Sequence, residues 1–255
     1  MNRNDVEKQY DFMSHFYNVL YSVVDMRAWE DAFIDEHRQL LNGLKPDAKV
    51  LDSSCGNGIQ AAALKRNGIN VIATDISKEM IKLTQEYAQK NNLLFPARQL
   101  SWEQLPDSFG DDFDVVFCYG NSISHSIDKM DMLKNIRSLY KVIKNGGKLV
   151  IDTRNWDKVI KENVRFVTSE VKEYVDKKYI FTYIWNLSGF DERSSVEILF
   201  IEIINGKETE CIPHRLDFTP FEHDEFVQRL KDCGLKIVID NFQADKDTYS
   251  IILEK

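Results

Sequence analysis

The stretch Lys49-Val50-Leu51-Asp52-Ser53-Ser54-Cys55-Gly56-Asn57-Gly58 decides the fold of this chain. A short β run ends in Asp52, and a pair of glycines then opens a helix. The apolar run Asn70-Val71-Ile72-Ala73-Thr74 follows and ends in a second carboxylate, Asp75. This order of elements is typical of a nucleoside site. The glycines let the backbone approach a ligand closely, and Asp75 can accept hydrogen bonds from both hydroxyls of a ribose.

Two cofactors fit this pattern, because Gly56-Asn57-Gly58-Ile59-Gln60-Ala61 also satisfies the G-x-G-x-x-G/A pattern of dinucleotide-binding enzymes. A dinucleotide would bring its anionic pyrophosphate to the helix N-terminus, close to Asp52. That carboxylate would repel phosphate, but it suits the ammonium and sulfonium charges of S-adenosylmethionine. The residues therefore favour S-adenosylmethionine. In the alternative, the segment is an ordinary βαβ turn in which Asp52 only caps a helix.

The composition limits the class of protein. A chain of 255 residues is long enough for one large α/β domain with an insertion, and 43% hydrophobic with 29% charged residues is typical of globular proteins. No apolar run has the length of a membrane span, and Met1-Asn2-Arg3-Asn4-Asp5 is too polar to begin a secretory signal. We therefore expect a cytoplasmic protein that binds no membrane.

Charge and cysteine content narrow the partners further. The formal net charge is -8, from 33 basic and 41 acidic residues, so we expect no nucleic acid as a partner. The four cysteines, Cys55, Cys118, Cys211 and Cys233, contain no C-x-x-C pair. That spacing favours free thiols over disulfides or zinc, and we expect no metal.

The hydrophobic pattern predicts an α/β fold with a doubly wound, mostly parallel seven-stranded sheet of the Rossmann-like type. Apolar runs alternate with helical segments, and Asp114-Val115-Val116-Phe117-Cys118 has the continuous apolar character of a strand covered on both faces. Ser77 is placed to cap a helix that runs to about Lys90. Residues 5–43 have helical spacing of their apolar side chains.

After Asn163 the pattern changes to closely spaced β runs without helices between them. Asn205-Gly206 is a strong hairpin signal. We predict a single domain over residues 1–255, in which residues 1–45 form an N-terminal helical lid and residues 164–218 form an antiparallel β insertion that covers the pocket. The predicted strands of the insertion are Glu170–Val175, Tyr179–Leu187, Ser195–Ile204 and Glu208–Asp217.

Two further motifs carry a resemblance to a known family. They are Cys118-Tyr119-Gly120-Asn121-Ser122-Ile123-Ser124-His125 and Gly146-Gly147-Lys148-Leu149-Val150-Ile151-Asp152-Thr153-Arg154-Asn155-Trp156-Asp157. With these motifs the chain resembles the class I S-adenosylmethionine-dependent methyltransferases, and within them the glycine and sarcosine N-methyltransferases. The resemblance is strongest over residues 50–157. It implies S-adenosylmethionine as cofactor, S-adenosylhomocysteine as product, and glycine or sarcosine as substrate on the way to dimethylglycine or betaine. It also allows a homo-oligomer.

The resemblance implies that Asn121 and Arg154 hold the carboxylate of the amino-acid substrate. The rigid fork of an arginine fits a carboxylate with two hydrogen bonds. In the alternative, Arg154 forms a surface salt bridge with Asp152 or Asp157. The family counterpart of His125 lines the methyl-transfer site, although a lone histidine after a strand is often only a hydrogen-bonded structural residue. The residues identify no general base for the amine proton.

The resemblance also implies a set of cofactor-binding residues. Trp102 resembles the aromatic residue beside the adenine, and its alternative role is that of a buried packing residue. Tyr10, Tyr17, Tyr21 and Arg27 resemble a family pattern of aromatic residues followed by an arginine that closes over the methionine end of the cofactor. The alternative is an amphipathic helix whose tyrosines pack on the sheet. The predicted cofactor-binding residues are Tyr21, Arg27, Asp52, Ser53, Gly56, Gly58, Asp75, Ile76, Ser101, Trp102 and Tyr119.

The chain departs from the family in the insertion. A tyrosine pair that the family carries before Pro-His appears here as Cys211-Ile212-Pro213-His214, and two more pocket tyrosines correspond to Phe166 and Trp185. This leaves open which methylation state of the amine is preferred. The alternatives are a methyltransferase for another small amine, such as dimethylglycine only, a nucleotide-binding module without catalysis, and a nicotinamide dehydrogenase, which Asp52 opposes.

Overall fold

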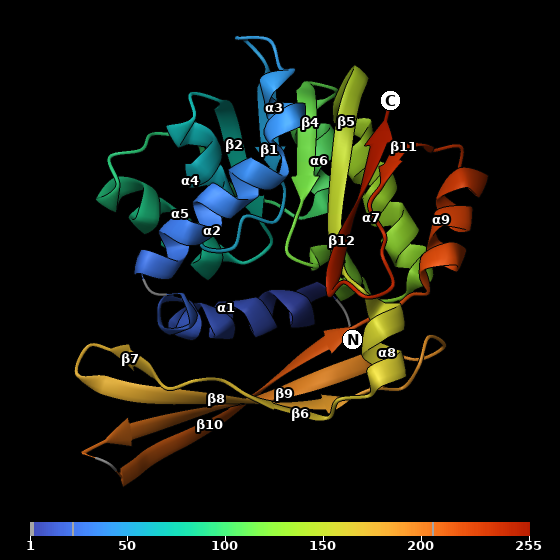
Figure 1. Cartoon of the computed structure of the whole chain (residues 1–255). Helices are drawn as coiled ribbons and strands as arrows, with labels where there is room; N and C mark the ends of the chain where they lie inside the picture. The colour runs from blue at the N-terminus through green and yellow to red at the C-terminus, as the bar shows by residue number, and fades with distance from the viewer. Residues whose placement is uncertain (1–2, 22, 206) are drawn as a thin grey trace.

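Two β-sheets and one helix between them form the framework of the protein. The computed structural model describes residues 3–21, 23–205 and 207–255. A large sheet with flanking helices forms one part, and a smaller antiparallel sheet lies beneath its edge (Figure 1). Helix α1 (Arg3–Leu20) lies between the two sheets.

The large sheet has seven strands in the order β11-β12-β5-β4-β1-β2-β3. Strands β1 to β5 pair in parallel, and β12 pairs antiparallel with both β5 and β11. This arrangement confirms the predicted doubly wound, mostly parallel sheet. The strands are β1 (Lys49–Asp52), β2 (Asn70–Asp75), β3 (Ala97–Gln99), β4 (Phe113–Cys118), β5 (Ile143–Arg154), β11 (Lys236–Asp240) and β12 (Thr248–Glu254).

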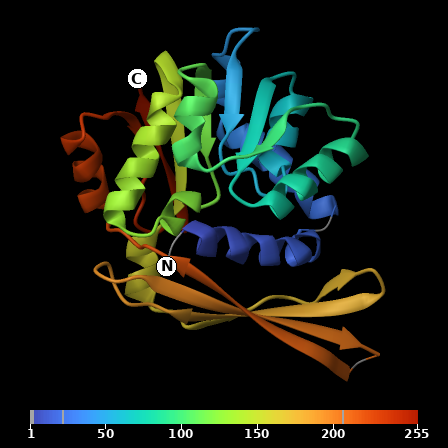
Figure 2. The same ribbon diagram turned by 180° about the vertical axis from the view of Figure 1, so that it is seen from behind.

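Helices cover both faces of the large sheet and bury its apolar side chains. One core joins the sheet to α2 and α4 through Phe33 and Leu64, and the other joins it to α7 and α9 through Ile136 and Leu230. Figure 2 shows α7 in front of the sheet when the molecule is seen from behind. The Ser77 hydroxyl accepts from Met80 N at 3.1 Å, which confirms the predicted N-cap. The helices are α2 (Val23–Glu36), α3 (Arg38–Asn42), α4 (Ile59–Arg66), α5 (Lys78–Lys90), α6 (Leu105–Phe109), α7 (Lys129–Lys141) and α9 (His223–Asp232).

The smaller sheet is the antiparallel insertion that follows β5 and α8 (Trp156–Glu162). Its inner face packs on α1, where the ring of Phe16 stacks on Phe200 at 3.8 Å and the ring of Phe12 stacks on His214 at 4.4 Å. Its strands are β6 (Phe166–Thr168), β7 (Lys172–Tyr174), β8 (Lys177–Asn186), β9 (Ser194–Ile204) and β10 (Lys207–Phe218).

The strands of the insertion differ from the prediction at two places. The predicted run Glu170–Val175 shortens to β7, because Val175 and Asp176 have φ angles of 48° and 62° and turn the chain into β8. The strand β6 was not predicted. Of the predicted hairpin Asn205-Gly206, the glycine lies outside the described residues. Within the described ranges, no helix is long and apolar enough to cross a membrane.

Candidate functional site

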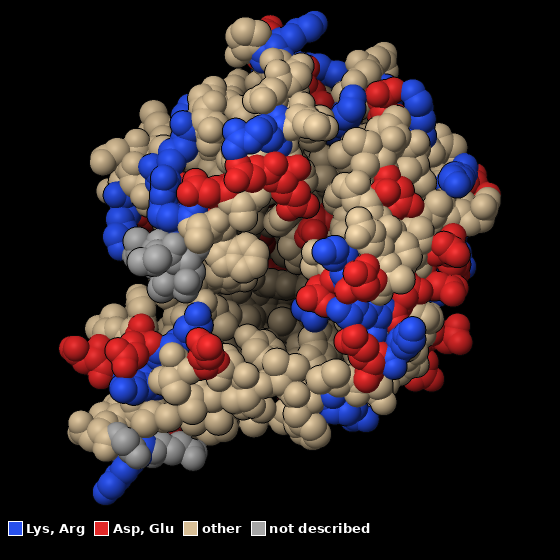
Figure 3. All heavy atoms as spheres, viewed as in Figure 1, with Lys and Arg blue, Asp and Glu red and all other residues tan. Residues whose placement is uncertain are grey.

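A cavity of about 420 Å³ lies between α1 and the carboxyl ends of β1, β2, β4 and β5. Its mouth is the hollow near the middle of the face in Figure 3. The volume lies in the range of small-molecule sites, and this edge is where open α/β sheets bind ligands. The predicted site residues that line it are Tyr21, Ser53, Gly56, Asp75, Ile76, Ser101, Trp102, Tyr119, Asn121, His125 and Arg154.

Three predicted site residues do not line the cavity. Arg27 lies on the exposed side of α2, where its Nη1 donates to Glu30 Oε2 at 2.6 Å. Gly58 has a φ of 87°, and a Cβ atom there would lie 2.9 Å from Thr84 Cγ2, so this glycine lets α4 approach α5. Asp52 is only 1% exposed, so its carboxylate is buried next to the cavity-lining residue Ser53 and does not itself line the cavity.

The buried carboxylate of Asp52 has no hydrogen-bond partner within the described residues. Burial raises its pKa to about 7, and the nearby charge of Asp75 raises it too. The backbone N–H groups of Ser54 and Ala61 lower the pKa, but neither reaches hydrogen-bond geometry. An unpaired buried carboxylate makes its surroundings favourable for positive charge.

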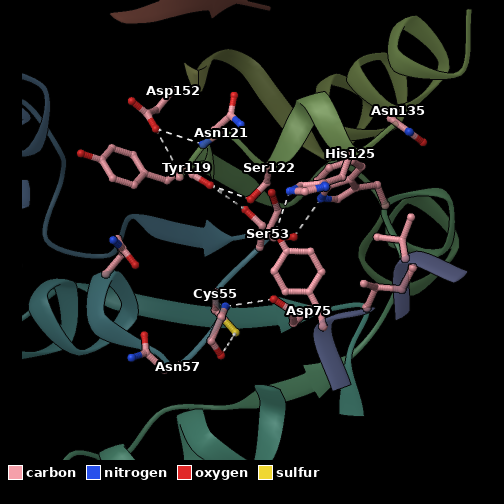
Figure 4. A pocket seen from close by; sticks show the side chains of 18 of the residues that line it. Ser53, Cys55, Asn57, Asp75, Tyr119, Asn121, Ser122, His125, Asn135 and Asp152 are labelled. Atoms are coloured by element: carbon pink, nitrogen blue, oxygen red, sulfur yellow. Dashed lines mark hydrogen bonds between the residues drawn. The ribbon is translucent and has the colours of Figure 1, made fainter. Parts of the chain in front are cut away.

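The carboxylate of Asp75 lies at the end of β2 and faces the cavity (Figure 4). Its Oδ2 accepts from Gly56 N and its Oδ1 accepts from Ser77 N, each at 2.9 Å. Burial raises its pKa to about 6. Because a carboxylate offers about four lone-pair sites, acceptor capacity remains for two further donors.

Trp102 both packs and lines the cavity. Its indole Nε1 donates to Ser53 O at 2.8 Å, which fixes the ring against the loop after β1. It begins the short helix η1 (Trp102–Gln104), which Ser101 and Gln104 close with a capping box. The Trp102 side chain is thus held in a fixed place in the wall of the cavity.

At the other end of the cavity, Asn121 occupies the turn after β4 in a left-handed conformation, with a φ of 61°. Its side-chain Oδ1 accepts from Arg154 N at 3.0 Å and from the Thr153 hydroxyl at 3.1 Å. A backbone N–H can only donate, so the atom that faces it must be the amide oxygen. The Nδ2 group of Asn121 is therefore turned the other way, and it donates to no side chain or carbonyl of the described ranges.

Asp152 holds this turn in place. Its Oδ1 accepts from Gly120 N at 2.8 Å and from Asn121 N at 3.3 Å (Figure 4). Burial raises the pKa of Asp152 to about 6. Its neighbour Tyr119 donates its hydroxyl proton to Glu36 at 2.7 Å.

The guanidinium of Arg154 stacks over the ring of Trp185 at 4.9 Å and lines the cavity. The alternative of a salt bridge with Asp152 or Asp157 is not realised, because Asp152 binds the turn after β4 and Asp157 accepts from His223 N at 3.0 Å. Within residues 3–21, 23–205 and 207–255, no carboxylate forms an ion pair with Arg154. Its charge is therefore available to an anion in the cavity.

His125 combines the two roles left open for it. Its Nδ1 lies 3.0 Å from Asp217 O, so Nδ1 carries the proton and donates. Its Nε2 must then accept from the Tyr10 hydroxyl at 2.6 Å. Burial lowers the pKa of His125 to about 4, which keeps the ring neutral. The histidine is thus a hydrogen-bonded structural residue that also lines the cavity.

Tyr10 and Tyr17 on α1 line the cavity, although the predicted set of cofactor-binding residues leaves them out. Both belong to the aromatic pattern of the N-terminal segment, and their spacing of seven residues places both side chains on one face of α1. Asp152 also lines the cavity and was not predicted as a site residue. Its position two residues before Arg154 on β5 puts both side chains on the same face of the strand.

Within the described chain, no cluster of three or more His, Cys, Asp or Glu side chains could hold a metal ion. Cys55 and Cys118 are buried free thiols, and Cys211 and Cys233 are free as well.

Comparison with known proteins agrees with this geometry. Residues 50–147 match the family model described as "Methyltransferase domain". The glycine/sarcosine N-methyltransferase of Aphanothece halophytica is 31% identical over 117 residues, which are 46% of this chain and 44% of that protein. The glycine N-methyltransferase of Oryctolagus cuniculus is 34% identical over 128 residues, which are 44% of this chain and 42% of that protein. The matches thus span less than half the length of these curated relatives.

A solved structure of similar fold is an S-adenosylmethionine-dependent methyltransferase from Clostridium acetobutylicum. It superposes with a TM-score of 0.71 and covers 95% of this chain and 97% of its own. At 18% sequence identity, this similarity concerns the fold alone.

Proposed function

We propose that this class I S-adenosylmethionine-dependent methyltransferase methylates the amine of glycine, sarcosine or both. The observation that carries the proposal is the pair of donor groups at one end of the cavity. The guanidinium of Arg154 has no carboxylate partner among the described residues, and the Nδ2 group of Asn121 is turned away from its own hydrogen bonds. Such a pair suits the carboxylate of a small amino acid.

The other end of the cavity fits the cofactor. Asp75 keeps acceptor capacity for the two hydroxyls of a ribose, and Trp102 with Ile76 offers apolar surface for an adenine ring. The unpaired charge of Asp52 favours a cation near the loop after β1 and disfavours a pyrophosphate. Bound S-adenosylmethionine supplies a methyl group on a positively charged sulfur.

The residues of the cavity then have to hold the substrate amine in line with that methyl group. Correct orientation can supply roughly 7–11 kcal/mol of the barrier reduction. Arg154 and Asn121 would anchor the carboxylate and thereby set the position of the nitrogen. The Tyr10 hydroxyl donates its hydrogen bond to His125, so its oxygen can still accept a hydrogen bond and can orient an amine N–H. His125 is not free to act as a base unless it releases Tyr10.

The proposal rests also on the relatives, whose printed names are glycine N-methyltransferase and glycine/sarcosine N-methyltransferase. A methyl-transfer assay with labelled S-adenosylmethionine across glycine, sarcosine, dimethylglycine and methylamine tests it. We expect turnover of glycine or sarcosine and little of methylamine, which lacks the carboxylate. Turnover of dimethylglycine alone would support the alternative of a different small amine. Cofactor binding without turnover of any amine would support a non-catalytic nucleotide-binding module.

A further inference from the structure

The small sheet has a second face, which points away from α1. Side chains alternate between the two faces of a strand, and Phe181, Trp185 and Phe200 point to the buried inner face. The residues between them point outward, and strand pairing aligns them in rows, such as Ile180 opposite Ile201. We call the following residues the outer face: Phe166, Ile180, Ile184, Leu199, Ile201, Ile203, Cys211 and Pro213.

The outer face is apolar and uncovered. None of its eight side chains is fully buried, and Phe166 is 69% exposed. In Figures 1 and 2 the described helices all lie on the side of α1, and none lies on the far side of β8 and β9. A contiguous apolar face of this kind marks an interaction surface in a folded protein.

The outer face carries little net charge, so a partner need not be strongly charged. Lys178 on β8 pairs with Glu173 on β7 at 3.0 Å, and Glu197 on β9 lies opposite Arg215 on β10. Arg215 also pairs with Asp217 at 2.8 Å. The described charged side chains on this side of the sheet are therefore few and mostly paired, two basic against three acidic, whereas the whole chain has a net charge of -8. A second copy of this acidic chain would meet little repulsion here.

We propose that the outer face is the interface of a homodimer, in which the small sheets of two copies pack face to face about a two-fold axis. Such an isologous contact covers both apolar faces at once, and stacked sheets pack about 10 Å apart. The strands of the small sheet are about 30 Å long, and four of them about 4.8 Å apart give a sheet face of roughly 500 Å² per copy. Two copies would therefore bury on the order of 1,000 Å² in total, which is the lower limit for a specific interface.

Sedimentation of the full chain tests the proposal. We expect the wild type to sediment with twice the chain mass. Ile201→Glu should raise the dissociation constant of the dimer at least about tenfold, because the contact would bury an unpaired carboxylate. Leu94→Glu is the matched control, since Leu94 is 87% exposed on a loop before β3, and we expect it to remain dimeric. Binding of S-adenosylhomocysteine measures whether each variant is folded.

A second variant guards against misfolding of the first. Phe166 lies at the rim of the outer face and is too exposed to contribute to the core, so Phe166→Glu should fold and also weaken the dimer. A wild type that sediments as a monomer would overturn the proposal, including a monomer that binds lipid vesicles. A dimer that Phe166→Glu and Ile201→Glu leave as strong as that of Leu94→Glu would overturn it as well.

Discussion

The hydroxyl of Tyr10 lies 2.6 Å from Nε2 of His125, and the two rings meet edge to face with their centroids 5.1 Å apart. This hydrogen bond joins α1 to the short helix η2 (Ser122–His125) after β4, across 115 positions of the chain. Because His125 donates its Nδ1 proton to Asp217 O, Tyr10 is the donor of the pair. The two side chains therefore act as one unit at the wall of the cavity.

If the two residues act as a unit, their substitutions should not be additive. We expect Tyr10→Phe and His125→Phe each to lower kcat/KM for the amino acid by roughly tenfold. The double variant should lose little more than either single variant, since all three lack the hydrogen bond between the two side chains. A double-mutant cycle measures this. Losses that simply multiply would show that the two side chains act independently.

The affinity of the cofactor should depend on pH through Asp75. Burial raises the pKa of Asp75 to about 6 in the free protein, and hydroxyl donors of a ribose favour its ionised form. Affinity for S-adenosylhomocysteine should therefore rise as the pH increases through about 6 and then level off. Calorimetry should show this rise in affinity for the wild type. Asp75→Asn should bind S-adenosylhomocysteine about 1.5–3 kcal/mol more weakly, and its affinity should no longer rise near pH 6. If the affinity of Asp75→Asn still rises near pH 6, another group titrates there.

The buried charge of Asp52 should destabilise the free protein at neutral pH. Its folded pKa of about 7 lies above the unfolded value of about 3.9, so the folded state binds the proton more tightly and stability falls as the pH rises between these values. Asp52→Asn should therefore raise the melting temperature at pH 8 and change it little at pH 4. A lower melting temperature of the variant at pH 8 would contradict this account.

The same variant should distinguish cofactor from product. S-adenosylmethionine carries a sulfonium charge that S-adenosylhomocysteine lacks, so Asp52→Asn should weaken the former more than the latter, by about 1 kcal/mol or a factor of about five. Parallel titrations with both ligands measure the ratio. An unchanged ratio would mean that the carboxylate does not act on the sulfur.

Helix α1 should respond to the cofactor, as expected of a lid. It packs on the small sheet through Phe12 and Phe16 and contributes Tyr10 and Tyr17 to the cavity. Hydrogen exchange over residues 8–20 should slow when S-adenosylhomocysteine is added. Unchanged exchange would mean that these tyrosines only pack against the sheet.

Local patterns were sufficient to predict the large sheet and several of the residues that line the cavity. Alternating strands and helices defined the topology, and Asp75 and Trp102 lie in the cavity where their motifs indicated. These features depend on neighbours within a few residues, such as the Ser77 cap of α5. These features could be predicted because hydrophobic periodicity and the ends of strands are determined by consecutive residues.

The side-chain partners of the other site residues could not be predicted, because they come from distant segments of the chain. Arg154 has Asp152 and Asp157 as sequence neighbours, but both carboxylates bind backbone N–H groups of other segments, which only the fold reveals. Arg27 is placed elsewhere because Glu30, one turn further along α2, also binds Arg66 and thus ties the helix to α4. The pairing of Tyr10 with His125 has no local signal.

We propose above all that Arg154 selects an amino acid over a plain amine. The most direct test measures kcat/KM for glycine and for methylamine in the wild type, in Arg154→Lys and in Arg154→Ala. Lysine keeps the charge but loses the fork, so Arg154→Lys should lose much of kcat/KM for glycine and Arg154→Ala should lose more. Neither substitution should change cofactor affinity or the low rate with methylamine. Near wild-type turnover of glycine by Arg154→Ala, or equal use of glycine and methylamine by the wild type, would contradict the account.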